Sequence, residues 1–528
     1  MARVLVQLKI RLLLNALRSS RRARVSFIFS SLFAVLVAAG TFVVLALLRG
    51  LSAPVDLTAT IFTLFAFGWL ILPVMLFGLD GTLDPATLAM YPVRTRTLAA
   101  GLLAASATGA WPAANVIGLL GVTVGLARGA FGELIAVVAV VLQVLFCIAM
   151  ARCLTTGLAG LLRSRRGKDF AAFLVVPLFA LYELFAQTVP RLAAEGEITA
   201  RAFAGVDRWL QWLPPGLAAH AIQDASTGHP GAALLRLVLL AAVIVVLGAL
   251  WIHFLSRALV TADTTTQSSA VRGAPLPFAR GGLRGTVAGR FLVYQRRDPA
   301  SVVRWCIIAV VMGAASIAAL RTPHYAVGLV LSSVLGAGMV SLLHANSIGF
   351  TGPSFWLEAA SLTSARDLRS YLAGRNVALA VIALPLMLTV SGALAVASGH
   401  PVYAIWAADI DVAAIGAALA MSSIFTVNLA YPGQQRAGSP VPGNADGYSG
   451  QAIGSSLGSI LGVAVLTLPV TLTMLATDSL ATPARVPLLT VLAVACGAAL
   501  AWGGTRTAAT AARLQLPELN QIAAQSTF

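Results

Sequence analysis

Residues 131–162 read FGELIAVVAVVLQVLFCIAMARCLTTGLAGLL, and the basic run RSRRGK follows at once at 163–168. A transmembrane helix needs about 20 mostly apolar residues. Arginine and lysine collect in the loops on the cytoplasmic side of a membrane. The stretch therefore predicts a helix that crosses a membrane and ends on its cytoplasmic side.

The composition of the whole chain agrees with this local prediction. Of 528 residues, 58% are hydrophobic and only 10% are charged, and the mean hydropathy is +0.87. A soluble domain is about 25% charged, so a soluble protein is excluded. The net charge of +17 comes almost entirely from arginine. These arginines lie in short segments between apolar stretches, which favours cytoplasmic loops over a nucleic-acid partner.

The four cysteines lie in apolar stretches without C-x-x-C spacing, so we expect neither disulfides nor a metal site.

About twelve apolar stretches are long enough to span a bilayer. The first half of the chain contains Ser26–Leu48, Val55–Leu79, Leu98–Leu126, Phe131–Leu162, Phe170–Val189 and Ala232–Leu259. The second half contains Ser301–Leu320, His324–Ile348, Leu372–Ser398, Val402–Ala430, Gln451–Ala476 and Pro487–Thr505. The predicted fold class is an all-α polytopic membrane protein with about twelve transmembrane helices.

Arginine placement gives the predicted sidedness of these stretches. Arg18 precedes the first stretch, residues 94–96 (RTR) follow the second, and residues 163–168 follow the fourth. These loops, and with them both chain termini, are expected in the cytoplasm. Residues 2–20 predict a basic amphipathic helix that leads into the first stretch, so we expect a retained N-terminus rather than a cleaved signal peptide.

The two halves of the sequence repeat one plan. Each begins with a basic amphipathic stretch, at 4–24 and again at 283–297, and continues with two apolar stretches, a cytoplasmic segment of about twenty residues and four more apolar stretches. Between them, residues 261–282 (TADTTTQSSAVRGAPLPFARGG) have the composition of a flexible linker. We therefore expect a fused duplication of two pseudo-symmetric, parallel six-helix halves, at 1–260 and 283–528, joined by a cytoplasmic linker.

A short helix is specified in the cytoplasmic segment of the first half. Asp84 can cap the free amides at its start, and Pro85 suits the first helical position. Further on, Pro92 forces Tyr91 out of the helical conformation. The result is a helix of about two turns that could lie on the membrane face. Such a helix either docks on a soluble partner or only anchors its loop at the lipid headgroups.

The second half has a counterpart to this short helix. Residues 354–360 (SFWLEAA) occupy the matching place. Ser364-Ala-Arg-Asp367 follows, and its S-x-x-D spacing is a capping box that opens the next helix.

This order of elements resembles the permease of an ABC-2 type exporter. The resemblance rests on the basic amphipathic helix, two spans, the segment LDPATLAMYPVRTRTLAAG at 83–101, three spans, and an extracellular insertion before the last span. That insertion is Arg191–Gly231, in which WLPPGLAAHAI at 212–222 resembles the family's extracellular segment, which partly re-enters the membrane. More narrowly, the chain resembles the large actinobacterial permeases (ABC type V exporter-like) in which two six-span halves are fused.

The resemblance implies partners and site residues. In that family the amphipathic helix and the short helix, called the coupling helix, contact a separate soluble ABC ATPase that binds ATP and Mg. The resemblance assigns this contact in the first half to Asp84, Pro85, Tyr91, Arg94 and Arg96, and in the second half to Glu358, Arg366 and Asp367. It also implies two ATPase copies, a bacterial cytoplasmic membrane, contact with membrane lipids, and outward movement of a hydrophobic or amphipathic cargo such as a drug, an antibiotic or a lipid. The short cytoplasmic helix of the second half lacks the D-P and Y-P pairs, and the insertion of this half, Thr477–Thr482, is short, so the halves are not expected to engage ATPases identically.

Catalytic patterns in the chain are weak. Residues 454–458 (GSSLG) match G-x-S-x-G but lie in an apolar stretch rather than on a strand-to-helix turn. Gly462 continues the four-residue glycine spacing, which favours close helix packing. Residues 160–168 have the wrong spacing for a phosphate loop, and Asp169 stands where Ser or Thr is required. We expect no ATP site in this chain, and the six scattered histidines support no metal site.

Ionisable residues inside spans are costly and are therefore functional candidates. Glu183 lies in the outer part of the fifth stretch, where it either contacts a polar or cationic cargo or pairs with an arginine. Glu133, Asp409 and Asp411 are expected near the outer start of a span, where the helix dipole favours a carboxylate. Glu183 and Asp411 are the candidates for a cargo pathway, and a purely structural role is the alternative for both.

Two other functional classes remain open at this point. A membrane-embedded transferase acting on lipids would need His, Asp or Glu clustered at one membrane depth, and no such cluster is visible. An ion-coupled secondary transporter would need buried carboxylates near the midplane, for which Glu183 is a candidate. The sequence favours a transport subunit that is not itself an enzyme.

The predicted topology can be tested with single cysteines. A cysteine at Thr227, in the predicted extracellular insertion, should react with an impermeant thiol reagent in intact cells. A cysteine at Thr264, in the predicted cytoplasmic linker, should react only after lysis. The reverse pattern would overturn the predicted sidedness.

Overall fold

The structure is a computed structural model. It describes residues 2–19, 21–51, 54–72, 94–162, 207–260, 281–297, 299–320, 325–397, 399, 402–434, 443–444, 448–477 and 482–526.

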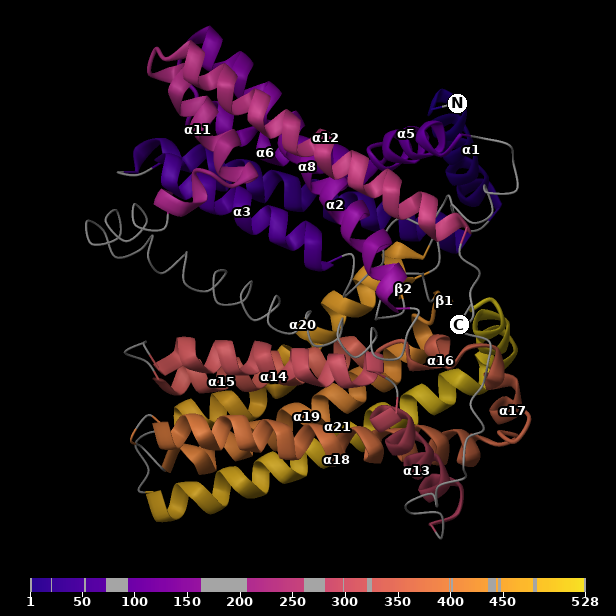
Figure 1. The fold of residues 1–528 in the computed structure, drawn as a ribbon. Coiled ribbons are helices and arrows are strands. Elements are labelled where there is room, and N and C mark those ends of the chain that lie inside the picture. The colour runs from indigo at the N-terminus through magenta and orange to yellow at the C-terminus, as the bar shows by residue number, and fades with distance from the viewer. Residues whose placement is uncertain are drawn as a thin grey trace. The chain divides into compact units, whose positions relative to one another are not determined.

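The chain forms two compact units, each of which is described by itself (Figure 1). The helices of unit 1 are α1 (Ala2–Ser19), α2 (Arg21–Leu47), α3 (Pro54–Leu72), α5 (Thr95–Ser106), α6 (Ala110–Leu119), α7 (Gly121–Gly125), α8 (Gly129–Leu162), α11 (Pro214–Ser226) and α12 (Pro230–Val260). Those of unit 2 are α13 (Gly282–Arg297), α14 (Pro299–Leu320), α15 (Tyr325–His344), α16 (Ser347–Thr351), α17 (Phe355–Ala359), α18 (Ala365–Ala397), α19 (Val402–Asn428), α20 (Ser449–Ala476) and α21 (Thr482–Ala524). Two 3-10 turns, η1 (Leu48–Gly50) and η4 (Gly352–Ser354), and two strands of two residues each, β1 (Gly433–Gln434) and β2 (Gly443–Asn444), complete the described elements. The duplication into halves at 1–260 and 283–528 stays a prediction.

The all-helical, membrane-type fold is confirmed. Eight described helices are long and apolar enough to cross a membrane: α2, α8, α12, α15, α18, α19, α20 and α21. The count rises to nine if a bent pair in unit 1 is one span. The apolar parts of α3 and α14 are shorter, and the predicted stretch Phe170–Val189 lies outside the described residues. The described part of the chain therefore does not confirm twelve spans.

The third predicted stretch, Leu98–Leu126, is a broken helix rather than a continuous one, and its crossing of the membrane as one span stays a prediction. It breaks between α5 and α6, and the two parts are bent by 67°. At the break Gly109 has a φ of 142°, which non-glycine residues rarely adopt. Beyond it, the glycines of α6 and α7 pack on α2, where a Cβ at Gly121 would overlap the backbone of Phe42. The corresponding helix of unit 2, α18, runs unbroken through Pro385. The two units therefore differ at this span.

The outer faces of several helices are apolar. On α2, the side chains of Ile28, Leu32, Leu36 and Leu47 are each at least 65% exposed. Their spacing of three to four residues or its multiples places them along one side of the helix. A continuous exposed stripe of this kind is expected of a helix that faces lipid.

Within unit 1, α8 and α12 run side by side and α11 packs against both (Figure 1). The amphipathic helix predicted at the N-terminus is α1, and it packs on α5. Lys9 is buried in this contact, and its ammonium group donates hydrogen bonds to the carbonyl oxygens of Ala105 (2.7 Å) and Thr108 (2.9 Å). A lysine that donates to the carbonyl oxygens at a helix C-terminus is favoured by the helix dipole.

Within unit 2, α19 is the most enclosed of the candidate spans, because 78% of the residues in its most apolar segment are buried. It packs against α15, α18 and α21 (Figure 1). The contact with α21 is made backbone to backbone. A Cβ at Gly416 would overlap the carbonyl group of Gly497, and a Cβ at Gly504 would overlap Ala420. Small residues allow this approach and so set the distance between the two helices.

This crossing gives a stability prediction. Gly416→Leu should destabilise unit 2 by about 3 kcal/mol or more, because the added side chain meets a backbone that cannot move aside. The matched control is Gly503→Leu on α21, where a Cβ would have no neighbour within 4 Å. Thermal unfolding of the purified chain should show a large loss for the first variant and little change for the second. Equal losses of stability in the two variants would mean that the contact between α19 and α21 does not require glycine at Gly416.

Candidate functional site

The predicted partner-contact residues of the first half are described only in part. Asp84, Pro85 and Tyr91 lie outside the described residues. Arg94 directly precedes α5 in an extended conformation, and its carbonyl oxygen accepts hydrogen bonds from the amides of Thr97 and Leu98. The side chains of Arg94 and Arg96 are both exposed. They therefore place two accessible positive charges at the start of α5.

The predicted short helix of the second half is present as α17, preceded by η4. Its Phe355 is buried, and the ring lies 6.4 Å from that of Tyr371 of α18. Trp356 and Leu357 are 57% and 59% exposed. One side of α17 is thus held against unit 2, while the other presents two large apolar side chains.

The predicted capping box is confirmed. The Ser364 amide (3.0 Å) and hydroxyl (2.7 Å) donate to the Asp367 carboxylate, and the Asp367 amide donates back to the Ser364 hydroxyl at 3.2 Å. Reciprocal bonds of this kind satisfy the free amides at a helix start. Arg366 is exposed beside them. The box fixes the point at which the chain leaves the α17 loop and enters α18.

Glu358 connects α17 to the amphipathic helix of its half. Its carboxylate forms an ion pair with Arg290 of α13. The carboxylate is largely buried whereas the arginine is about half exposed. The sequence placed both residues in their segments but gave no sign that they pair, because they are far apart along the chain. This pair joins α17 to α13, which packs on α18. Together with α21, on which α17 packs, these helices form one assembly at one end of unit 2 (Figure 1).

Of the two predicted pathway residues, Glu183 lies outside the described residues. Asp411 is fully buried in α19. The helix begins at Val402, as predicted, but Asp411 lies nine residues further on, and the first turn of α19 has no acidic residue. The dipole of the first turn therefore does not explain this carboxylate.

A buried arginine lies nearer the other end of α19. The guanidinium of Arg375 in α18 donates to the hydroxyls of Ser347, Ser422 and Ser423 and to the amide oxygen of Asn376. The side chain is completely buried. Its charge is thus held by neutral hydrogen-bond acceptors from α16, α18 and α19.

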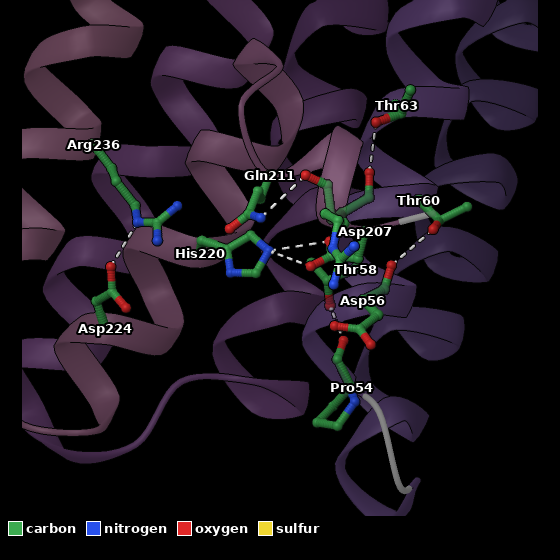
Figure 2. A network of polar contacts seen from close by, with 12 residues as sticks. Pro54, Asp56, Thr58, Thr60, Thr63, Asp207, Gln211, His220, Asp224 and Arg236 are labelled. Carbon is green, nitrogen blue, oxygen red and sulfur yellow. Dashed lines mark hydrogen bonds and ion pairs between the residues drawn. The ribbon is translucent and has the colours of Figure 1, made fainter. Parts of the chain in front are cut away.

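Unit 1 contains a polar network that sequence reasoning missed (Figure 2). The imidazole Nε2 of His220 in α11 lies 2.9 and 3.1 Å from the two carboxylate oxygens of Asp207. Both residues are buried, and Asp56 at the start of α3 is close enough to interact electrostatically with both. Figure 2 also shows the ion pair between Arg236 and Asp224, with Nε and the carboxylate oxygen 2.7 Å apart.

Local backbone packing makes the Asp207–His220 contact possible. Residues 207–210 are helical, and a turn at 211–213 leads from them into α11, whose first positions are Pro214 and Pro215. A Cβ at Gly216 would overlap the carbonyl group of Leu210, so glycine lets the turn fold back on the helix. The prolines and glycine of WLPPG were the visible signal for this turn. The pairing of an aspartate with a histidine thirteen residues later could not be predicted from spacing alone.

The catalytic patterns of the sequence have structural explanations. The Ser456 hydroxyl donates to the Ala452 carbonyl oxygen at 2.7 Å. A Cβ at Gly458 or Gly462 would press into the side chains of Phe425 and Met421. The predicted close helix packing is confirmed at these two glycines. Among the described residues, no group of three or more His, Cys, Asp or Glu could hold a metal ion.

Comparison of the chain with protein families, curated proteins and solved structures finds no match. The function must therefore be argued from the geometry above.

The Asp207–His220 pair gives a testable energetic prediction. Asp207→Ala and His220→Ala should each destabilise unit 1, because each leaves a buried polar group without its partner. The double variant should lose less than the sum, with a coupling of about 1–3 kcal/mol in unfolding measurements. The control is Asp224→Ala at the more exposed pair with Arg236, where a smaller loss is expected. Strict additivity at Asp207 and His220 would show that their contact contributes little.

Proposed function

We propose that this chain is the membrane-spanning permease of an ATP-driven ABC exporter of the bacterial cytoplasmic membrane. In this proposal a separate ATPase subunit, in two copies, hydrolyses ATP, and the chain moves a hydrophobic or amphipathic small molecule outward. Both termini and the α17 end of unit 2 face the cytoplasm. The observation that carries the proposal is the assembly of α13, α17 and the start of α18.

This assembly has the features that a coupling element requires. Phe355 and the Arg290–Glu358 ion pair fix α17 to unit 2, so the short helix cannot move without its surroundings. The capping box then leads into α18, which is 33 residues long. A force applied to α17 by a soluble partner would therefore reach the far end of a span.

The exposed side of α17 suits a protein partner. Trp356 and Leu357 project from it, and the arginines 366 and 369 at the start of α18 are exposed nearby. Large aromatic and arginine side chains are the residues most enriched in the energetic centres of protein interfaces. In the first half, Arg94 and Arg96 at the start of α5 supply corresponding charges.

A groove in unit 2 has a lining that suits an amphipathic cargo. It has a volume of about 1020 Å³ and lies between α13, α14 and α18. Arg296 and Arg297 line it on the side of α13, while Val302, Ile382 and Leu386 form its apolar wall. A molecule with an apolar body and a polar or anionic end would match both parts.

The proposal predicts an effect of reversing the Arg290–Glu358 pair. Glu358→Arg should lower cargo-stimulated ATP hydrolysis of the reconstituted complex by about fivefold or more, the range typical of coupling between sites. Adding Arg290→Glu to it should restore most of the stimulation, because the pair is rebuilt with its charges exchanged.

The control is the same exchange at Asp224 and Arg236, a pair in unit 1 on the predicted outer side. That exchange should leave stimulated hydrolysis unchanged. Folded Glu358→Arg protein with full stimulation would make α17 a loop anchor only. Failure of the chain to bind any ABC ATPase encoded beside it would overturn the proposed function itself.

A further inference from the structure

Asp411 has an unusual environment in the centre of unit 2. Its side chain is fully buried in α19, and its nearest polar neighbours are the hydroxyls of Ser333 in α15 and Ser391 in α18. Both serines are also buried, at 0% and 1% exposure. Three different helices thus bring oxygen atoms to one point.

The three residues lie at matching depth. Ser333 is eight residues after the start of α15, Asp411 is nine after the start of α19, and Ser391 is six before the end of α18. At 1.5 Å per residue, each lies about 9–14 Å from its helix end. These ends meet on the side of unit 2 opposite α17 (Figure 1). The three residues therefore lie at one depth inside the helix bundle rather than at its surface.

None of these oxygens is satisfied by the described residues. Both carboxylate oxygens of Asp411 and the hydroxyls of Ser333 and Ser391 lack a hydrogen bond of acceptable geometry. An ionised carboxylate buried without a partner is strongly unfavourable in an apolar environment. A positive charge delivered to this point would remove that cost.

Among the described residues, the charged groups of the surrounding helices do not supply it. Asp409, on the same helix, is directed to Thr490 of α21. Arg485 of α21 lies over the ring of Trp406 at 4.4 Å and donates to the Met474 carbonyl oxygen. On α15 and α18, the cationic or titratable groups His344 and Arg375 lie far along the helices, about 16 Å or more from the level of Ser333 and Ser391.

We propose that Asp411, Ser333 and Ser391 form a binding site for one monovalent cation. The charge is set by the single carboxylate, because a divalent ion would leave a net positive charge in the bundle. A proton and Na⁺ share this chemistry. A proton requires Asp411 alone, whereas Na⁺ also uses the serine hydroxyls as ligands.

Occupancy of the site would be linked to helix packing. With the cation bound, α15, α18 and α19 close around a neutral centre. Without it, the carboxylate must be hydrated, and water can enter only if the helices separate. The bound cation therefore stabilises the closed packing of unit 2 by mass action. This inference does not rest on an ATPase partner.

The test is thermal unfolding of the purified full-length chain alone. At fixed pH, Na⁺ replaces choline at constant ionic strength. In a second series without Na⁺, the pH is lowered from neutral to mildly acidic. In at least one series the wild-type Tm should rise by a few degrees as the concentration of Na⁺ or of protons increases. Asp411→Asn should remove that rise, because a neutral amide needs no cation. Asp409→Asn is the matched control and should keep the wild-type response.

A second variant separates the two cations. Ser333→Ala combined with Ser391→Ala should weaken a response to Na⁺ but leave a response to protons intact. A wild-type Tm that is flat in both series would overturn the proposal, as would an Asp411→Asn variant that responds like the wild type.

A labelling measurement on the wild type covers the case in which Asp411→Asn does not fold. Dicyclohexylcarbodiimide, an apolar reagent that modifies protonated carboxyl groups, should label Asp411 in peptide mass spectra. Labelling should decline as pH rises or as Na⁺ is added. Absence of label on Asp411 under every condition would also overturn the site.

Discussion

Inside an apolar bundle a helix satisfies its own backbone hydrogen bonds, but each buried polar side chain must find a partner from a neighbouring helix. In unit 2 this constraint falls most heavily on α19, which is enclosed by α15, α18 and α21. Glycines bring α21 against it, as at Gly416 and Gly497. At such distances little room is left for water, so the polar side chains of α19 and its neighbours must satisfy one another or bind something else.

Arg375 and Asp411 show the two outcomes of this constraint. Arg375 is buried in the same unit, yet it is held by three serine hydroxyls and an asparagine oxygen. Its donors are largely satisfied, which makes a structural role sufficient. The described residues bring the hydroxyls of Ser333 and Ser391 to Asp411, and neither forms a well-directed hydrogen bond with it. A functional explanation is needed where partners are missing, and this distinguishes the aspartate from the arginine.

Features that depend on neighbouring residues in the chain could be predicted from the sequence. The capping box of Ser364 and Asp367 spans four residues, and the apolar stretch of α8 is visible in composition alone. The break at Gly109 was also signalled, since Thr-Gly-Ala-Trp-Pro at 108–112 is a turn-like sequence. The apolar composition of Leu98–Leu126 predicted a span there but did not by itself indicate the break.

Features that depend on long-range contacts could not be predicted. Glu358 and Arg290 are both charged residues in expected cytoplasmic segments, but only the packing of α13 brings them together. The Asp207–His220 contact requires a turn made possible by Gly216. Asp411 itself was recognised as a candidate. Its serine neighbours come from two other helices, and a hydropathy pattern does not show how those helices are rotated about their axes.

One helix, α18, connects the proposed partner-contact region of unit 2 to the proposed cation site. The capping box at Asp367 fixes one end of α18 beside α17, and Ser391 lies 24 residues further along the same helix, about 36 Å away. Between them, Arg375 ties α18 to α19. A displacement of α17 that shifts or tilts α18 relative to α19 about this tie would change the distance of Ser391 from Asp411. Conversely, a cation that closes the helices around Asp411 restricts the positions available to α18 and hence to α17. By thermodynamic linkage such coupling would act equally in both directions. The cation site and the partner-contact end would then be two ends of a single mechanical element.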